Sequence, residues 1–182
     1  AYGATDTYGS QAVWSDYEGV WHLTNTNDSS ANGYDLTESA SAPTSSAGYI
    51  GTATTGSYTF DRDNHQQLSI ADASCPNLEI SGSQTWSCWA KGTENNTSSG
   101  SGVVAGKCAS GDPPAKQMWW LDSTNAAHGK IHFQLAGLTT NNYVQTSTQT
   151  YLYNNWHYAT GVYDSANSKL RLIVNGDTYE VT

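Results

Sequence analysis

The residues of this chain best suited to chemistry are aromatic side chains that stand close to amides. A sugar stacks the C–H face of its ring on an exposed aromatic ring, and planar amides hold the sugar hydroxyls by hydrogen bonds. Residues 117–154 offer this combination, with Asn141, Gln145 and Asn154 as further polar neighbours. We expect a glycan-binding surface that contains Trp119, Trp120, Tyr143, Tyr151, Tyr153 and Asn142.

The two adjacent tryptophans cannot both belong to that surface. Successive residues of a strand point to opposite faces, so Trp119 and Trp120 lie on opposite sides of the strand predicted around them. One of them is a core residue. The other either faces a ligand or packs beneath a loop, and the sequence leaves both alternatives open.

A hydrolytic site is the least favoured chemistry. A glycosidase needs two carboxylates about 5–9 Å apart in a groove. The glutamates of this chain are scattered through loops and strand edges, and the sequence has no Gly-x-Ser-x-Gly segment that would mark a serine nucleophile. We therefore predict that the protein is not an enzyme, with a glycan-cleaving enzyme as the least favoured alternative.

The loop at residues 28–33 supports two interpretations. Asp28 and Asn32 offer oxygen ligands around a tight turn, and calcium takes six to eight such oxygens. No glutamate closes the loop as it would in an EF-hand. The loop is therefore either part of a calcium site or a hydrogen-bonded Asx-turn without metal.

The three cysteines allow at most one internal disulfide. Three reduced thiols and a single bridge both fit the sequence. Alternation places Cys88 on the same face as Trp86, which we expect to be the core face. The bridge that remains would join Cys75, before that strand, to Cys108, at the end of the next one.

Length and charge set broad limits on partners. A chain of 182 residues suits one domain, and its formal net charge is −9 with only seven basic residues. Nucleic acid and membrane insertion are therefore not expected. A polar surface of Ser, Thr, Asn and Gly with 21 aromatic residues is typical of extracellular β proteins, so we expect a secreted or cell-surface location.

Hydrophobic alternation with a period of two predicts an all-β fold. Its clearest segments are residues 85–91, 130–136 and 169–175, and an Asn-Gly hairpin turn follows the last of them. Further candidate strands are residues 19–23, 57–61, 67–71, 103–108, 117–122, 156–164 and 177–181. Short strands separated by turns indicate a two-sheet antiparallel sandwich or jelly roll.

Two segments carry a resemblance to a known family. Val13-Trp14-Ser15-Asp16-Tyr17-Glu18-Gly19-Val20-Trp21-His22-Leu23 resembles the opening of laminin-G-like domains from bacterial and archaeal surface proteins, and Trp156-His157-Tyr158-Ala159-Thr160-Gly161-Val162-Tyr163-Asp164 resembles their penultimate hairpin. The resemblance implies a concanavalin A-like jelly roll that often carries calcium and recognises glycans or proteins. It divides the chain into a lead-in at residues 1–16 and a domain at residues 17–182.

The resemblance also implies strands beyond residue 182. Family members continue past the Asn-Gly turn with further strands, whereas this sequence ends at Thr182. We expect either that a second polypeptide, a neighbouring copy or a cleaved remainder, donates the last strands, or that the strand order differs from that of the family.

Taken together, these features predict a non-catalytic glycan-binding or adhesive module of a larger secreted or surface protein. A structural spacer or building block of an extracellular assembly, without a small ligand, is the alternative.

Overall fold

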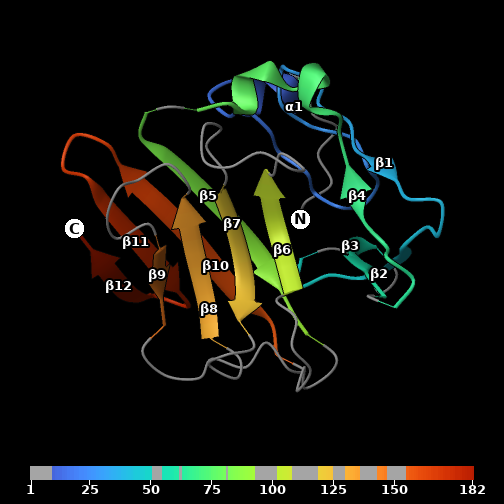
Figure 1. Cartoon of the computed structure of the whole chain (residues 1–182). Helices are drawn as coiled ribbons and strands as arrows, with labels where there is room; N and C mark the ends of the chain where they lie inside the picture. Colours follow the sequence, from blue (N-terminus) through green and yellow to red (C-terminus); the bar gives the residue numbers. More distant parts are fainter. Residues whose placement is uncertain are drawn as a thin grey trace. The chain divides into compact units, whose positions relative to one another are not determined.

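A computed structural model describes residues 10–50, 55–61, 63–80, 82–92, 102–107, 119–124, 130–135, 143–146 and 155–182 (Figure 1). The chain forms two compact units, Ala1–Leu78 and Glu79–Thr182. Each unit is described separately. The predicted boundary between residues 16 and 17 stays a prediction.

The second unit contains an antiparallel sheet whose strand order is β12-β11-β10-β5. Its strands are β5 (Gln84–Ala90), β10 (His157–Asp164), β11 (Lys169–Val174) and β12 (Asp177–Val181). Strand β11 alternates strictly between half-buried and buried residues, as its period-two pattern predicts.

The turn between β11 and β12 has the predicted two-residue form. Val174 pairs with Asp177, and Asn175 and Gly176 between them have φ angles of 51° and 100°. Two consecutive positive φ angles define the type I′ turn, whose twist matches that of the strands it joins. Asn and Gly are the residues that accept this backbone with least strain.

The second sheet has the order β6-β7-β8-β9. It consists of β6 (Gly102–Lys107), β7 (Trp119–Thr124), β8 (Lys130–Leu135) and β9 (Tyr143–Gln145), all antiparallel. Figure 1 shows this sheet in front of the first, with β9 beside β8. The described part of the second unit is therefore a two-sheet β-sandwich, which confirms the predicted fold class.

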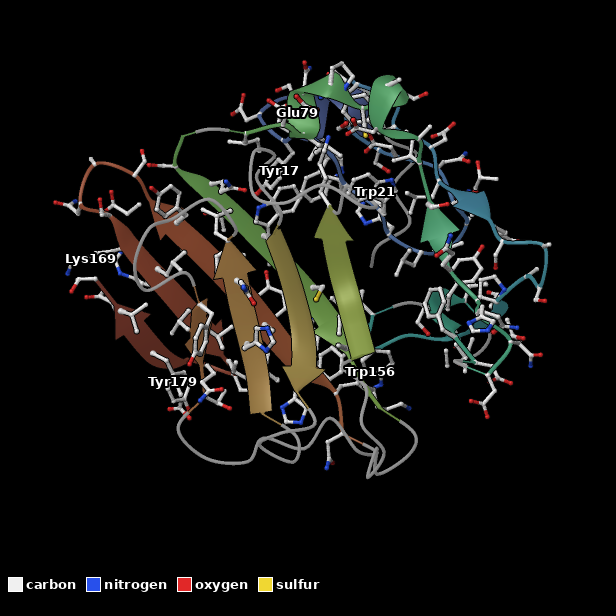
Figure 2. The ribbon with its side chains drawn as sticks, in the orientation of Figure 1. Tyr17, Trp21, Glu79, Trp156, Lys169 and Tyr179 are labelled. Atoms are coloured by element: carbon white, nitrogen blue, oxygen red, sulfur yellow. The ribbon has the colours of Figure 1, made fainter. Side chains whose placement is uncertain are left out.

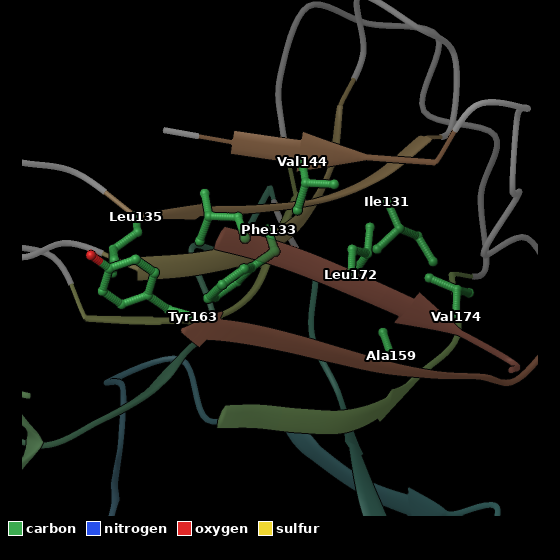
Figure 3. Packing of buried hydrophobic residues seen from close by; sticks show 9 residues of the cluster. Ile131, Phe133, Leu135, Val144, Ala159, Tyr163, Leu172 and Val174 are labelled. Atoms are coloured by element: carbon green, nitrogen blue, oxygen red, sulfur yellow. The ribbon is translucent and has the colours of Figure 1, made fainter. Parts of the chain in front are cut away.

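The core of the sandwich lies between the two sheets (Figure 3). Alternate residues of β8, β10 and β11 supply most of it, as predicted for β8 and β11. The buried residues are Ile131, Phe133, Leu135, Val144, Ala159, Tyr163, Leu170, Leu172 and Val174. Phe133 packs over Gly161 of the facing sheet, where a β-carbon would overlap the phenylalanine ring.

The register predicted for β5 is confirmed. Trp86 and Cys88 both pack against this core, while Trp89 pairs with Tyr158 on the opposite face. Trp86 is half-buried, and its indole N–H donates to Gln84 Oε1 at 2.6 Å. The outer edge position of this sheet belongs to β12, and strand donation to that edge stays a prediction.

The first unit is built from short elements. They are α1 (Ser10–Val13), β1 (Thr37–Glu38), β2 (Thr44–Ala47), β3 (Gly56–Thr59), β4 (Leu68–Ser69) and the 3₁₀ turns Asp72–Ser74 and Pro76–Leu78. Strand β1 pairs with β4, and β2 pairs with β3.

One strand prediction in this unit is wrong. The strand predicted at residues 19–23 is a single bridge between Trp21 and Asp28. The strand predicted at residues 57–61 is present as β3, in which Ser57 is buried, and Phe60 after its end is 46% exposed. The Ser57 hydroxyl donates to the Ala47 carbonyl at 3.0 Å, which satisfies the buried side chain.

Candidate functional site

The outward face of the sheet β6-β7-β8-β9 holds the candidate site. Ile131, Phe133 and Leu135 point into the core. The residues between them on β8, His132 and Gln134, therefore belong to the opposite face. On β9, Val144 is a core residue and Tyr143 is 50% exposed. We call this surface the Tyr143 face.

Strand register identifies which tryptophan position shares the Tyr143 face. Trp120 stands opposite Gln134, and Gln134 stands opposite Tyr143. Directly opposed residues of antiparallel strands occupy one face, so the three positions form a row across three strands. Trp119 stands opposite the fully buried Leu135, which assigns its position to the core side.

A second row lies beside the first. Asp122 stands opposite His132, and His132 stands opposite Gln145. The His132 ring meets the Tyr143 ring edge-on, with 6.4 Å between centroids, and His132 is only 7% exposed. The imidazole therefore supports the tyrosine ring from the neighbouring row.

This arrangement has the parts that saccharide recognition needs. Neighbouring strands lie about 4.8 Å apart, so the backbone positions of Trp120 and Tyr143 are about 9.6 Å apart, with Gln134 between them. The amides of Gln134 and Gln145 can each donate and accept hydrogen bonds beside an exposed ring. Asp122 is the single carboxylate position on the described strands of this face, whereas glycoside hydrolysis uses two.

The remaining predicted ligand residues, Asn142, Tyr151 and Tyr153, lie outside the described residues, as do Asn141 and Asn154. Their place in a glycan site stays a prediction. His132 and Gln134 are additions that the sequence prediction omitted. Their signal was available, because the inward alternation of Ile131, Phe133 and Leu135 places the residues between them outward.

A family model described as the concanavalin A-like lectin/glucanases superfamily, of the laminin G type, matches residues 62–182. The chain belongs to this superfamily. The match covers the whole sandwich and begins within the first unit. No curated protein and no solved structure matches the chain.

Because the superfamily includes glucanases, the positions of carboxylates and possible metal ligands in this chain matter for its function. Within the described residues, no three His, Cys, Asp or Glu side chains gather as a metal site.

The helices of the described residues are all too short or too polar to cross a membrane.

Asp28, predicted as a metal ligand, is the centre of a hydrogen-bond network in the first unit. Its Oδ1 accepts from the backbone N–H of Val20 at 2.7 Å and of Ser30 at 2.9 Å. Its Oδ2 accepts from the Ser30 hydroxyl at 2.6 Å and from the Tyr34 N–H at 2.9 Å. The bond from the Ser30 N–H is the Asx-turn that the sequence offered as the alternative to calcium.

This network leaves Asp28 poorly suited to calcium. A carboxylate has about four lone-pair sites, and four donors occupy them here. Asn32 is engaged as well, since its Nδ2 donates to Glu18 O at 3.0 Å and its Oδ1 accepts from Asn77 at 3.3 Å. Calcium binding at Asp28 and Asn32 would require the loop to rearrange, and it stays a prediction.

The predicted disulfide between Cys75 and Cys108 also stays a prediction, because Cys108 lies outside the described residues. Cys75 is buried, with its sulfur 3.5 Å from the Ala71 carbonyl oxygen and 3.6 Å from that of Asp72.

Cys88 is expected to resist alkylation in the folded protein. Burial raises the pKa of its thiol to about 12, so the reactive thiolate is scarce at pH 8. Iodoacetamide labelling followed by peptide mass spectrometry should show Cys88 modified only when urea is added. Rapid labelling of Cys88 at pH 8 without denaturant would contradict its place against the core.

Proposed function

We propose that this chain is a non-catalytic glycan-binding module of a secreted or cell-surface protein, and that the Tyr143 face binds the saccharide. The observation that carries the proposal is the row formed by Trp120, Gln134 and Tyr143, in which an exposed ring stands directly beside an amide. Membership of a superfamily that contains lectins supports a lectin-like role.

Binding would proceed by stacking and hydrogen bonding on a rigid surface. The apolar face of a sugar ring lies on Tyr143, while Gln134 and Gln145 hydrogen-bond to its hydroxyl groups. The sheet fixes these side chains from below, because Phe133 and Val144 anchor the same two strands in the core. A surface that is already ordered binds without a large loss of conformational entropy.

The non-catalytic part of the proposal is supported by the described part of this face, which has one carboxylate position, Asp122. One carboxylate cannot supply both the general acid and the nucleophile or base. The glucanases of the superfamily are therefore the less suitable comparison for this face.

We expect Tyr143→Ala to lower the affinity for the bound glycan about tenfold. Removing one stacked ring costs about 1.4 kcal/mol, which corresponds to a factor of ten in the dissociation constant. A glycan array identifies the ligand, and isothermal titration calorimetry measures the affinity of wild type and variant. The array is run both with calcium chloride and with EDTA, which tests the predicted calcium requirement.

The matched control is Tyr49→Ala, since Tyr49 is 59% exposed but belongs to the first unit. It should bind as wild type does. A module that binds no glycan on the array would instead support the structural spacer. Equal binding by Tyr143→Ala and wild type would place the glycan on another surface.

A further inference from the structure

The outward face of the other sheet, β12-β11-β10-β5, carries a second group of aromatic residues. Trp89 of β5 stands opposite Tyr158 of β10, with 5.2 Å between ring centroids and 45° between ring planes. Next to this pair, the Lys91 ammonium lies 5.0 Å from the centroid of the Trp156 ring. Figure 2 labels Trp156 at this end of the sandwich.

Core packing does not account for these rings. Beneath them, the inward positions of β5 and β10 are Cys88, Ala90, His157 and Ala159, of which all but His157 are small. Tyr158 is 41% exposed, and Trp89 and Trp156 are half-buried. The large rings of this end of the sheet therefore lie on its outer surface, where they offer apolar faces to a ligand.

The turn between β11 and β12 holds the Tyr158 end of strand β10 in place. Asn175 Oδ1 accepts from the Tyr158 backbone N–H at 3.0 Å, and the Asn175 N–H donates to the Tyr158 carbonyl at 3.0 Å. The Asn175 side-chain amide also hydrogen-bonds to His157 Nδ1 at 2.9 Å. The ring of Tyr158 thus projects from a backbone that is fixed on the β11 side as well as by β5.

The charge of this face differs from that of the chain as a whole. Three of the seven basic residues, Lys91, Lys169 and Arg171, lie on it beside two carboxylates, Asp164 and Glu180, although the net charge of the chain is −9. Lys169 and Arg171 both form ion pairs with Glu180, with 2.7 Å from Lys169 Nζ to Oε1 and 2.5 Å from Arg171 Nε to Oε2. Within the residues that the structure describes, Lys91 contacts the Trp156 ring and no carboxylate pairs with it.

We infer that this end of the sheet is a second binding site, and that its ligand is an acidic saccharide. The apolar face of the sugar ring stacks on Tyr158 and Trp89. Its carboxylate accepts a charge-assisted hydrogen bond from Lys91, whose position over Trp156 leaves the other N–H groups available. Charge complementarity selects a uronate over a neutral sugar, because no carboxylate of the described residues neutralises Lys91.

The probe is polygalacturonate, with its fully methyl-esterified form as the matched neutral ligand. Affinity gel electrophoresis and calorimetry on the full chain compare wild type with Lys91→Gln and Tyr158→Ala. We expect wild type to bind the acid and not the ester. Each substitution should weaken binding about tenfold, and Lys91→Gln should also reduce the dependence of affinity on salt.

Controls separate this site from the Tyr143 face. Lys107→Gln removes a lysine from the other sheet, and Tyr143→Ala removes the other exposed ring; both should bind polygalacturonate as wild type does. Unfolding midpoints of all variants confirm that the fold is intact.

Any of three results with saccharides would overturn the inference. The first is equal binding of polygalacturonate and its methyl ester. The second is that Tyr143→Ala loses binding whereas Lys91→Gln binds as wild type does. The third is that wild type binds none of polygalacturonate, alginate and hyaluronan. Binding of polyglutamate that depends on Lys91 but not on Tyr158 would also overturn it, since the face would then be a site for charge alone.

Discussion

Phe133→Ala is expected to lower the free energy of unfolding of the sandwich by about 3–5 kcal/mol. The Phe133 side chain is fully buried between the two sheets and lies over Gly161. Its removal takes a whole aromatic ring out of the core and leaves a cavity that two hydrogen-bonded sheets cannot close. Urea unfolding followed by circular dichroism measures the change.

The chain provides a matched control, because it contains only two phenylalanines. Phe60 is 46% exposed, so Phe60→Ala should change the free energy of unfolding by less than about 1 kcal/mol. A loss below about 1 kcal/mol for Phe133→Ala would mean that the two sheets do not pack through this ring.

A double-mutant cycle tests the contact itself. Gly161→Ala should destabilise the sandwich, because a β-carbon at this position overlaps the Phe133 ring. Phe133→Leu leaves room for that methyl group. The two changes together should therefore cost less than the sum of the single changes, whereas additive costs would contradict a direct contact.

The sequence predicts the sandwich well where one face of a strand is apolar. Alternation alone identifies the inward residues of β8 and β11, and the Asn175-Gly176 pair identifies the turn that joins β11 to β12. These features are local, so they can be derived from a few neighbouring residues. The inward position of Trp86 and Cys88 follows from the same rule.

The candidate sites depend on pairing between distant strands, which the sequence does not determine. The row of Trp120, Gln134 and Tyr143 exists because β7, β8 and β9 adopt one register, and a shift by one residue would exchange the two faces. For the same reason the sequence could not choose between Trp119 and Trp120. The pairing of Trp89 with Tyr158 joins strands about 70 residues apart and was not predicted.

The first unit was predicted least well because local hydrogen bonds organise it. Its strands have two to four residues, too few for alternation to be informative. Instead the Asp28 carboxylate collects donors from residues 20, 30 and 34. The sequence offered a calcium site or an Asx-turn at Asp28, and what the structure shows there is a loop held by hydrogen bonds.

Asp28 is also expected to make the first unit sensitive to acid. Burial by itself would raise the pKa of Asp28, but the hydrogen bonds from the Ser30 hydroxyl and from the N–H groups of Val20, Ser30 and Tyr34 outweigh it and hold the pKa below its usual value. A carboxyl with a lowered pKa in the folded state stabilises the fold at every pH above its unfolded pKa, near 3.8. That contribution is lost as the pH falls below 3.8 and through the folded pKa.

Asp28→Ala should therefore cost about 3 kcal/mol at pH 7, because it removes charge-assisted hydrogen bonds and leaves the backbone donors of Val20, Ser30 and Tyr34 without their acceptor. Asp28→Asn keeps one acceptor oxygen and should cost less. Urea unfolding measured from pH 7 to pH 2.5 should show a smaller fall in stability for both variants than for wild type, because the titrating group is gone. Asp16→Asn, an exposed carboxylate of the same unit, is the control and should follow the wild-type curve. If Asp28→Asn followed that curve as well, the acid sensitivity would come from other groups, and the loop would not depend on the charge of Asp28.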